Sequence, residues 1–258
     1  MIFLPTNSEK SQLLEFALVI SLCLIPSLIL LWYVYIKDKV EKEPFYLLIL
    51  LFLGGIIACT ISILLSILSK QYIYFLNSAY TDMNIFQILF KVLFTIVVIE
   101  EGSKWIINYI TIWRNKNFKH IYDPIVYCTF VAIGFATLEN IIYGVTFSSH
   151  GIAPVIMRGF ISVPSHAVFG IFMGYYLGIS KNALMYNKTK QSRKYRLLSI
   201  LVPIYLHLVY DLFLVKKNFI MYSLFIIYII VIYIMAYKRI KRLSSINKNL
   251  SQKEKDIS

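Results

Sequence analysis

Cysteines, prolines and acidic residues are all scarce in this chain of 258 residues, which has 3, 7 and 13 of them respectively. The cysteines are Cys23, Cys59 and Cys128, and none forms a CxxC pair, so we interpret them as packing residues rather than as zinc ligands or a redox motif. The chain also lacks a GxSxG elbow, an HExxH pair and a P-loop, which are the usual motifs of serine hydrolases, zinc proteases and nucleoside triphosphatases. No repeat of 20–50 residues is visible.

Long apolar runs are what the sequence has instead. Hydrophobic residues make up 59% of the chain and its mean hydropathy is +0.69. Several runs reach the ~20 residues that cross a ~30 Å hydrocarbon core as a helix. We therefore predict an all-α, polytopic transmembrane helix bundle, a single integral membrane domain over residues 1–258. Its seven expected spans are residues 12–36, 45–69, 86–112, 122–143, 155–179, 197–215 and 219–237.

Basic residues are distributed unevenly between the loops that join these spans. Of the 26 lysines and arginines, 19 fall in loops on one side of the membrane and 4 on the other. Positive charge accumulates on the cytoplasmic side, so we expect a cell-membrane protein with its N-terminus outside and its C-terminus in the cytoplasm. The net charge of +13 comes largely from these loops and from the basic tail, residues 238–258. We interpret the tail as a partner of anionic lipid headgroups in the bilayer, and we expect no nucleic-acid partner.

Six charged residues and two histidines lie inside the apolar spans. A charged side chain at that depth costs roughly 2.5–3.5 kcal/mol on insertion scales, so such residues are rare unless they have a function. Their number predicts one buried polar site, with residues contributed by the third to sixth spans. The eight residues are Glu100, Glu101, Lys104, Glu139, Arg158, His166, His207 and Asp211.

The third span carries Glu100, Glu101 and Lys104. Glu100 and Lys104 are four residues apart and share a helix face, so we expect these two to form an ion pair. Glu101 is rotated by about 100° from Glu100 and needs another partner or a substrate. The structural alternative is a neutralised pair that only allows the helix to insert, but this leaves the second glutamate unexplained.

The fourth span carries Glu139 and Asn140 in the segment GFATLEN. Phe135 and Glu139 share a face, and Gly134 allows a neighbouring helix to approach closely. A protonated glutamate bonded to a carbonyl would be the structural alternative for Glu139.

The fifth and sixth spans carry the histidines. His166 follows Pro164, which removes a backbone hydrogen bond and can open the helix toward a cavity. A satisfied core histidine is the structural alternative for His166, and Arg158 could extend to the outer headgroups instead. His207 and Asp211 are one turn apart on one face, so the carboxylate can fix the tautomer of the ring.

Such a cluster suits hydrolysis, which needs a base for water, an acid for the leaving amine and donors for the oxyanion. A proton- or ion-coupled carrier is the main alternative, because such carriers also use buried Glu, His and Asp relays. A haem protein with His166 and His207 as axial ligands is a second alternative.

The motifs together resemble the PrsW-type intramembrane proteases, relatives of the CAAX prenyl proteases and of bacteriocin-processing membrane proteins. The resemblance covers roughly residues 95–215. It rests on EEGSK at Glu100–Lys104, DP at Asp123–Pro124, FATLEN at Phe135–Asn140, the His166 segment and HLVYD at His207–Asp211, together with EKEP at Glu41–Pro44.

The resemblance implies a protease that cuts a single-pass anti-sigma factor in cell-envelope stress signalling. By analogy with the prenyl proteases, Glu100 activates water, and His207 with Asp211 stabilises the oxyanion. Glu139 stands where those relatives have histidine, and Lys104 replaces a more distant arginine. The predicted catalytic residues are Glu100, Glu101, Glu139, His166, His207 and Asp211, supported by Lys104, Asn140 and Arg158.

The charge of this site can be balanced in two ways. With all carboxyl and basic groups ionised and both histidines neutral, the site carries −2, which is hard to keep in a medium of low dielectric constant. Protons can cancel this charge, or a zinc ion can do so, held by His166, His207 and Glu139. We favour protons and expect no cofactor, because the chain lacks a His pair at i, i+4 and the resemblance points to glutamate-activated water.

Overall fold

The computed structural model describes residues 7–37, 42–72, 79–80, 83–146, 153–215 and 218–257. Within these ranges the regular structure is helical, with no strand, which confirms the all-α prediction. The elements are α1 (Asn7–Lys37), α2 (Phe45–Tyr72), α3 (Ile85–Val92), the π-helical turn η3 (Leu93–Val97), α4 (Val98–Ile112), α5 (Asp123–Thr146), α6 (Ala153–Met185), α7 (Thr189–Val215) and α8 (Phe219–Ile257).

Five helices, α2, α5, α6, α7 and α8, are long and apolar enough to cross a membrane. They coincide with five of the seven predicted spans. The first predicted span falls in α1, where the apolar stretch Ile20–Ile36 is shorter. The third is divided into α3, η3 and α4, because a π turn and the charged residues after it interrupt the apolar helix. The chain is a multi-pass membrane protein, and a crossing by these two segments stays a prediction.

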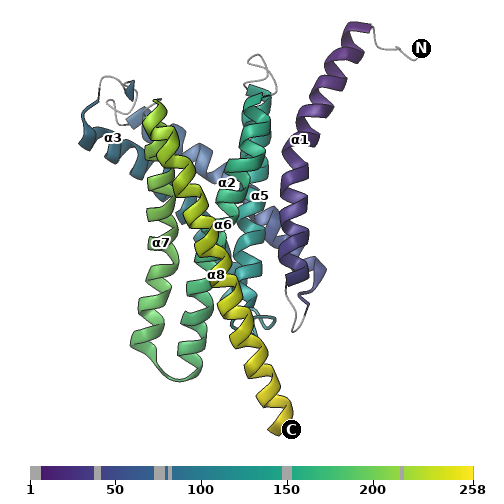
Figure 1. Ribbon diagram of the computed structural model, residues 1–258, viewed down its shortest axis with the longest axis vertical. Coiled ribbons are helices and arrows are strands. Elements are labelled where there is room, and N and C mark those ends of the chain that lie inside the picture. The colour runs from purple at the N-terminus through teal and green to yellow at the C-terminus, as the bar shows by residue number, and fades with distance from the viewer. Residues whose placement is uncertain are drawn as a thin grey trace.

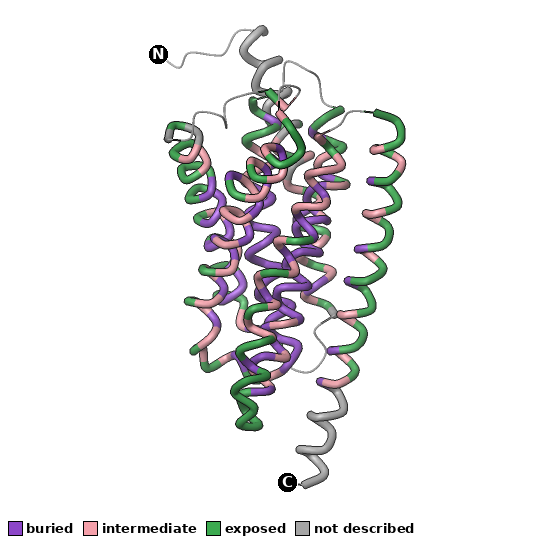
Figure 2. The backbone as a smooth tube through the Cα atoms, turned by 90° about the vertical axis from the view of Figure 1, so that its left-hand side faces the viewer, coloured by how far each residue is buried: buried purple, intermediate pink, exposed green. Residues whose placement is uncertain are grey.

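Helix α5 lies at the centre of the bundle and packs against α1, α2 and α6, while α6 also packs against α7 and α8 (Figure 1). Helix α1 begins at the upper end of the bundle in this view and α8 ends at the lower end. Buried residues concentrate in the central helices, whereas the described part of α8, residues 219–247, is largely exposed (Figure 2).

Glycines allow α5 to approach its neighbours backbone to backbone. A Cβ atom at Gly134 would lie 2.1 Å from the carbonyl oxygen of Phe52 in α2, and one at Gly174 of α6 would lie 2.1 Å from the carbonyl oxygen of Pro124. Small residues are the usual means of such close packing between membrane helices. The predicted close approach at Gly134 is confirmed, and it fixes the wall from which Glu139 projects.

Candidate active site

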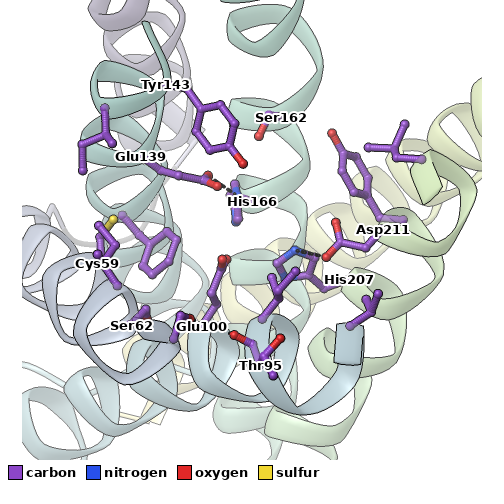
Figure 3. A pocket seen from close by; sticks show the side chains of 18 of the residues that line it. Cys59, Ser62, Thr95, Glu100, Glu139, Tyr143, Ser162, His166, His207 and Asp211 are labelled. Carbon is purple, nitrogen blue, oxygen red and sulfur yellow. Dashed lines mark hydrogen bonds and ion pairs between the residues drawn. The ribbon is translucent and has the colours of Figure 1, made fainter. Parts of the chain in front are cut away.

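The predicted site residues of four helices line one cavity of about 580 Å³, which α2 and η3 complete (Figure 3). Among the residues that line it are Glu100, Glu139, Arg158, His166, His207 and Asp211. Helices distant in sequence therefore bring six of the nine predicted residues to a common space.

Glu101 and Lys104 lie in the wall beside this cavity, both almost fully buried. Lys104 Nζ donates to Glu101 Oε1 at 2.6 Å, and His207 Nδ1 lies 2.8 Å from the same oxygen. The predicted pair of Glu100 with Lys104 is therefore wrong. Lysine reaches residues three or four positions away equally well, and here the interior partners lie on the side of Glu101. Glu100 points into the cavity instead (Figure 3).

His166 connects this pair to Glu139. Its Nδ1 lies 3.1 Å from Lys104 Nζ, and its Nε2 lies 3.0 Å from Glu139 Oε2. A lysine ammonium group can only donate, so Nδ1 accepts and the ring proton is on Nε2, from which it is donated to Glu139. The two neighbours thus fix both the tautomer and the orientation of the ring. Pro164 lies inside α6 without ending it, and His166 still reaches the cavity.

Arg158 closes the other side of Glu139. Its Nη2 lies 3.0 Å from Glu139 Oε2, and its guanidinium group stacks over the Tyr143 ring at 3.8 Å. Both charged side chains are partly exposed to the cavity, at 24% and 18% of their surface. Arg158 therefore forms an ion pair with a carboxylate of the site. It does not extend to the outer headgroups, which was the alternative that the sequence left open.

His207 lies between two carboxylates. Nδ1 faces Glu101, and Nε2 lies 3.6 Å from Asp211 Oδ2, an ion-pair distance longer than a hydrogen bond (Figure 3). The predicted neighbour Asp211 is thus the more distant partner of the ring. Sequence reasoning missed Glu101 as the nearer one because the two residues are 106 positions apart and only packing of α4 on α7 brings them together.

Two further groups of cavity residues were not predicted. Tyr143 and Tyr210 line the cavity, and Ser62, Ser66 and Thr95 line the wall formed by α2 and η3. The sequence did contain a signal for the serine wall, because Ser62 and Ser66 are four residues apart and therefore share one face of an apolar helix. Asn140, predicted as a supporting residue, is buried in α5 and is not among the cavity-lining residues described.

Glu100, His166 and His207 offer ligand atoms within 4.8 Å of one another, a donor set of the kind that holds a metal ion. It contains Glu100 where the sequence prediction had Glu139. The distances fit, and Glu101 behind His207 resembles the carboxylate that orients many metal-binding histidines. The hydrogen bonds of His166 do not fit, because Lys104 occupies the lone pair of Nδ1 and the proton on Nε2 faces Glu139. In this arrangement neither ring nitrogen of His166 is free to bind a metal.

The chain is similar to known proteins over most of its length. Residues 43–237 match the model of a family described as PrsW family intramembrane metalloprotease. The chain is 35% identical to Protease PrsW of Oceanobacillus iheyensis, over 87% of this chain and 95% of the relative. It is 34% identical to Protease PrsW of Clostridioides difficile, over 91% and 97%, and 32% identical to that of Bacillus subtilis, over 80% and 87%. No solved structure matches the chain.

These similarities favour the protease prediction over the carrier and haem-protein alternatives, and they extend well beyond the motif region on both sides. The chain therefore belongs to the PrsW family of intramembrane metalloproteases and is a multi-pass, membrane-embedded protease.

Proposed function

We propose that the protein hydrolyses a peptide bond of a single-pass membrane protein in this cavity, with water activated by Glu100. One observation carries the proposal. Glu101 and Glu139 are each held by a cation and a histidine, and Glu101 is not among the residues that line the cavity, although its Oε2 lacks a partner. Glu100 lines the cavity, and among the described residues neither a cation nor a histidine is paired with its carboxylate. A carboxylate that lines a polar cavity and is not held by a cation is suited to bind and activate the reacting water.

In this mechanism Glu100 accepts a proton from the water as its oxygen attacks the carbonyl carbon. His207 donates to the developing oxyanion from Nε2 in its doubly protonated form, in which Nδ1–H is donated to Glu101 and Nε2–H is left for the oxyanion; a neutral ring with its proton on Nδ1 could not do so. Glu100 then returns its proton to the leaving amine as the C–N bond breaks, which yields a carboxylic acid and an amine. Lys104 and Glu139 hold His166 in one tautomer and orientation beside this centre.

The substrate we propose is an anti-sigma factor with one transmembrane helix, acting in cell-envelope stress signalling. This part rests on the resemblance of the Glu100–Lys104, Phe135–Asn140 and His207–Asp211 motifs to the PrsW-type proteases. Co-expression of a tagged candidate anti-sigma factor with the wild-type chain should yield a shortened product whose new end mass spectrometry can locate. Glu100→Gln should abolish the product, and cleavage that survives this change would refute the proposed role of Glu100.

We further propose that protons, rather than a metal ion, balance the charge of the site. The pairs Glu101–Lys104 and Glu139–Arg158 cancel internally, which leaves the carboxylates of Glu100 and Asp211 beside two histidines. Shared protons among these groups would give a bell-shaped dependence of the cleavage rate on pH. Purified protein treated with a strong chelator should keep its activity and should contain less than one equivalent of zinc by mass spectrometry. Loss of activity that is restored by one equivalent of zinc would instead assign a metal to Glu100, His166 and His207.

We also propose that the N-terminus lies outside and the C-terminus in the cytoplasm, from the 19-to-4 distribution of basic residues. The beginning of α1 and the end of α8 at opposite ends of the bundle support an odd number of crossings (Figure 1). Reporter domains fused after Arg196 and after Arg242 should both signal from the cytoplasm. An external signal from either fusion would overturn the orientation.

A further inference from the structure

We propose that Ser62 and Ser66 of α2 are positioning residues that hold the π turn η3 and the start of α4, so that Glu100 faces the cavity. The inference rests on the proposed role of Glu100 and adds to it the means by which that carboxylate is oriented. Both serines and Glu100 line the same cavity.

The π turn decides which side of its helix faces the cavity. The N–H of Val98 bonds to the carbonyl of Leu93, five residues earlier, where a regular α-helix pairs residues four apart. One additional residue in a turn changes the direction of every following side chain by about 100° relative to the preceding helix. Glu100 comes three residues after the turn, so its direction relative to α3 depends on whether the π conformation is kept.

Ser66 contacts the middle of this turn. Its hydroxyl donates to the backbone carbonyl of Thr95 at 2.7 Å, and Thr95 and Ile96 also line the cavity. The hydroxyl of Thr95 donates to the carbonyl of Lys91 at 2.6 Å. The hydrogen bond from Ser66 in α2 to the Thr95 carbonyl favours the π conformation, in which this carbonyl is directed toward α2. Without this donor the carbonyl would face an apolar helix.

Ser62 contacts α4 one turn further along. Its hydroxyl lies 2.8 Å from that of Ser103, and Ser103 donates to the backbone carbonyl of Glu100 at 2.9 Å. Ser62 also lies 3.5 Å from the carbonyl of Ile99. This chain of hydroxyl groups therefore joins α2 to the backbone of the proposed base itself.

Ser66 differs in this respect from the other hydroxyl residues of α2. The hydroxyl of Ser62 makes both kinds of contact, because it also lies 2.9 Å from the carbonyl of Ala58 in its own helix. Thr60 and Ser69 donate to carbonyls of their own helix, at Ile56 and Ser66, which satisfies them without a partner helix. Ser66 donates across to η3 instead. Because a shift of about 1 Å at a catalytic group can lower a rate about 100-fold, even a modest rotation of α4 would be measurable.

The test compares Ser66→Thr with Ser66→Val, which have the same shape but only one of which keeps a hydroxyl. The assay substrate is a reporter built from the transmembrane segment that is cleaved in the co-expression experiment. We expect Ser66→Val to lower kcat roughly 10- to 100-fold with KM within about twofold of wild type, and Ser66→Thr to keep most of kcat. Ser69→Ala, whose hydroxyl bonds only within α2, should behave as wild type.

A second measurement follows the direction of residue 100 without requiring cleavage. In a background in which Cys23, Cys59 and Cys128 are replaced by serine, Glu100→Cys should react with a charged thiol reagent that enters the cavity. Adding Ser66→Val should slow this reaction about tenfold, and adding Ser66→Thr should not. If Ser66→Val fails to fold, Ser66→Ala takes its place in both measurements with a smaller change of volume.

Equal kcat values and equal labelling rates for the valine and threonine variants would overturn this inference. A parallel loss of kcat and thermal stability in both variants, with unchanged labelling, would show a packing role only and would also overturn it. Undiminished cleavage by Glu100→Gln would instead refute the proposed function, so the two failures can be distinguished.

Discussion

Helices α5 and α8 are both apolar enough to cross the membrane, yet they have opposite surroundings. The span of α8 has a mean hydropathy of 2.6 and only 17% of it is buried in the protein, whereas that of α5 has a mean hydropathy of 1.8 and is 78% buried (Figure 2). The more hydrophobic helix is thus the more exposed one. In a bilayer the lipid tails solvate apolar side chains, so hydrophobicity alone does not drive a helix to the centre of the bundle.

Polar groups, rather than apolar ones, distinguish the inner helix from the outer one. Helix α5 carries Glu139, which needs Arg158 and His166 as partners. Helix α8 attaches to the bundle through tyrosines on its inner side, of which Tyr228 donates to the carbonyl of Leu206 at 2.5 Å and Tyr233 to that of Ile161 at 3.3 Å. Changes at the polar interior should therefore affect activity and folding far more than changes at the lipid-facing surface.

The largest effect is expected at Glu100 and Glu101. Glu100→Gln removes the proposed base, and Glu101→Gln weakens the support of Lys104 and His207, so each should lower cleavage about 10³-fold while membrane insertion stays normal. Cleavage rates and the amount of protein in the membrane fraction test this. Tyr233→Phe in α8 is the control and should keep most activity. Near-normal cleavage by both glutamine variants would show that changes in the polar interior affect activity no more than changes in α8 do.

A second large effect is expected where α5 meets α2. Gly134→Ala would place a methyl group 2.1 Å from a backbone carbonyl that cannot move aside easily, and we expect it to destabilise the protein by about 3 kcal/mol. Gly102→Ala is the matched control, because a Cβ atom there meets no other atom within 4 Å. Thermal unfolding of both variants in the same detergent measures the difference. Equal stability would show that α5 is less closely packed than the structure indicates.

The Arg158–Glu139 pair should give an intermediate effect. Arg158→Met leaves Glu139 with only His166 as a partner, and because both charges are partly exposed to the cavity we expect a loss of about 2 kcal/mol rather than more. Adding Glu139→Gln should restore part of the stability, since the unpaired charge is then removed. A double-mutant cycle on thermal unfolding measures this coupling. Additive losses would mean that the pair does not contribute to folding.

The smallest effect is expected at the lipid-facing surface of α8. Ile230 is 53% exposed, and Ile230→Leu should change stability by less than about 0.5 kcal/mol and leave cleavage unchanged. Thermal unfolding and the cleavage rate test this in parallel. A loss as large as that of the Arg158 variant would indicate that α8 contacts another protein surface in the membrane.

Much of this site could be predicted because lipid makes buried charge costly. Residues such as Glu139, His166 and Asp211 stand out in apolar spans, and their order along the chain gave the family resemblance that the comparisons confirm. The partners of each group could not be predicted in the same way. Helical spacing suggested that Lys104 pairs with Glu100, but two residues one position apart on a helix are both within its reach.

The sequence by itself determined that the chain is a helical membrane protein and which residues are too polar to face lipid, because both follow from the cost of transferring each side chain into hydrocarbon. It could not determine how those residues are joined. That Glu101 holds Lys104 and His207 while Glu100 faces the cavity depends on the packing of α4 against α6 and α7 and on the single additional residue in the π turn. The contact between Glu101 and His207 joins residues 106 positions apart, and only the positions of the helices relative to one another decide it.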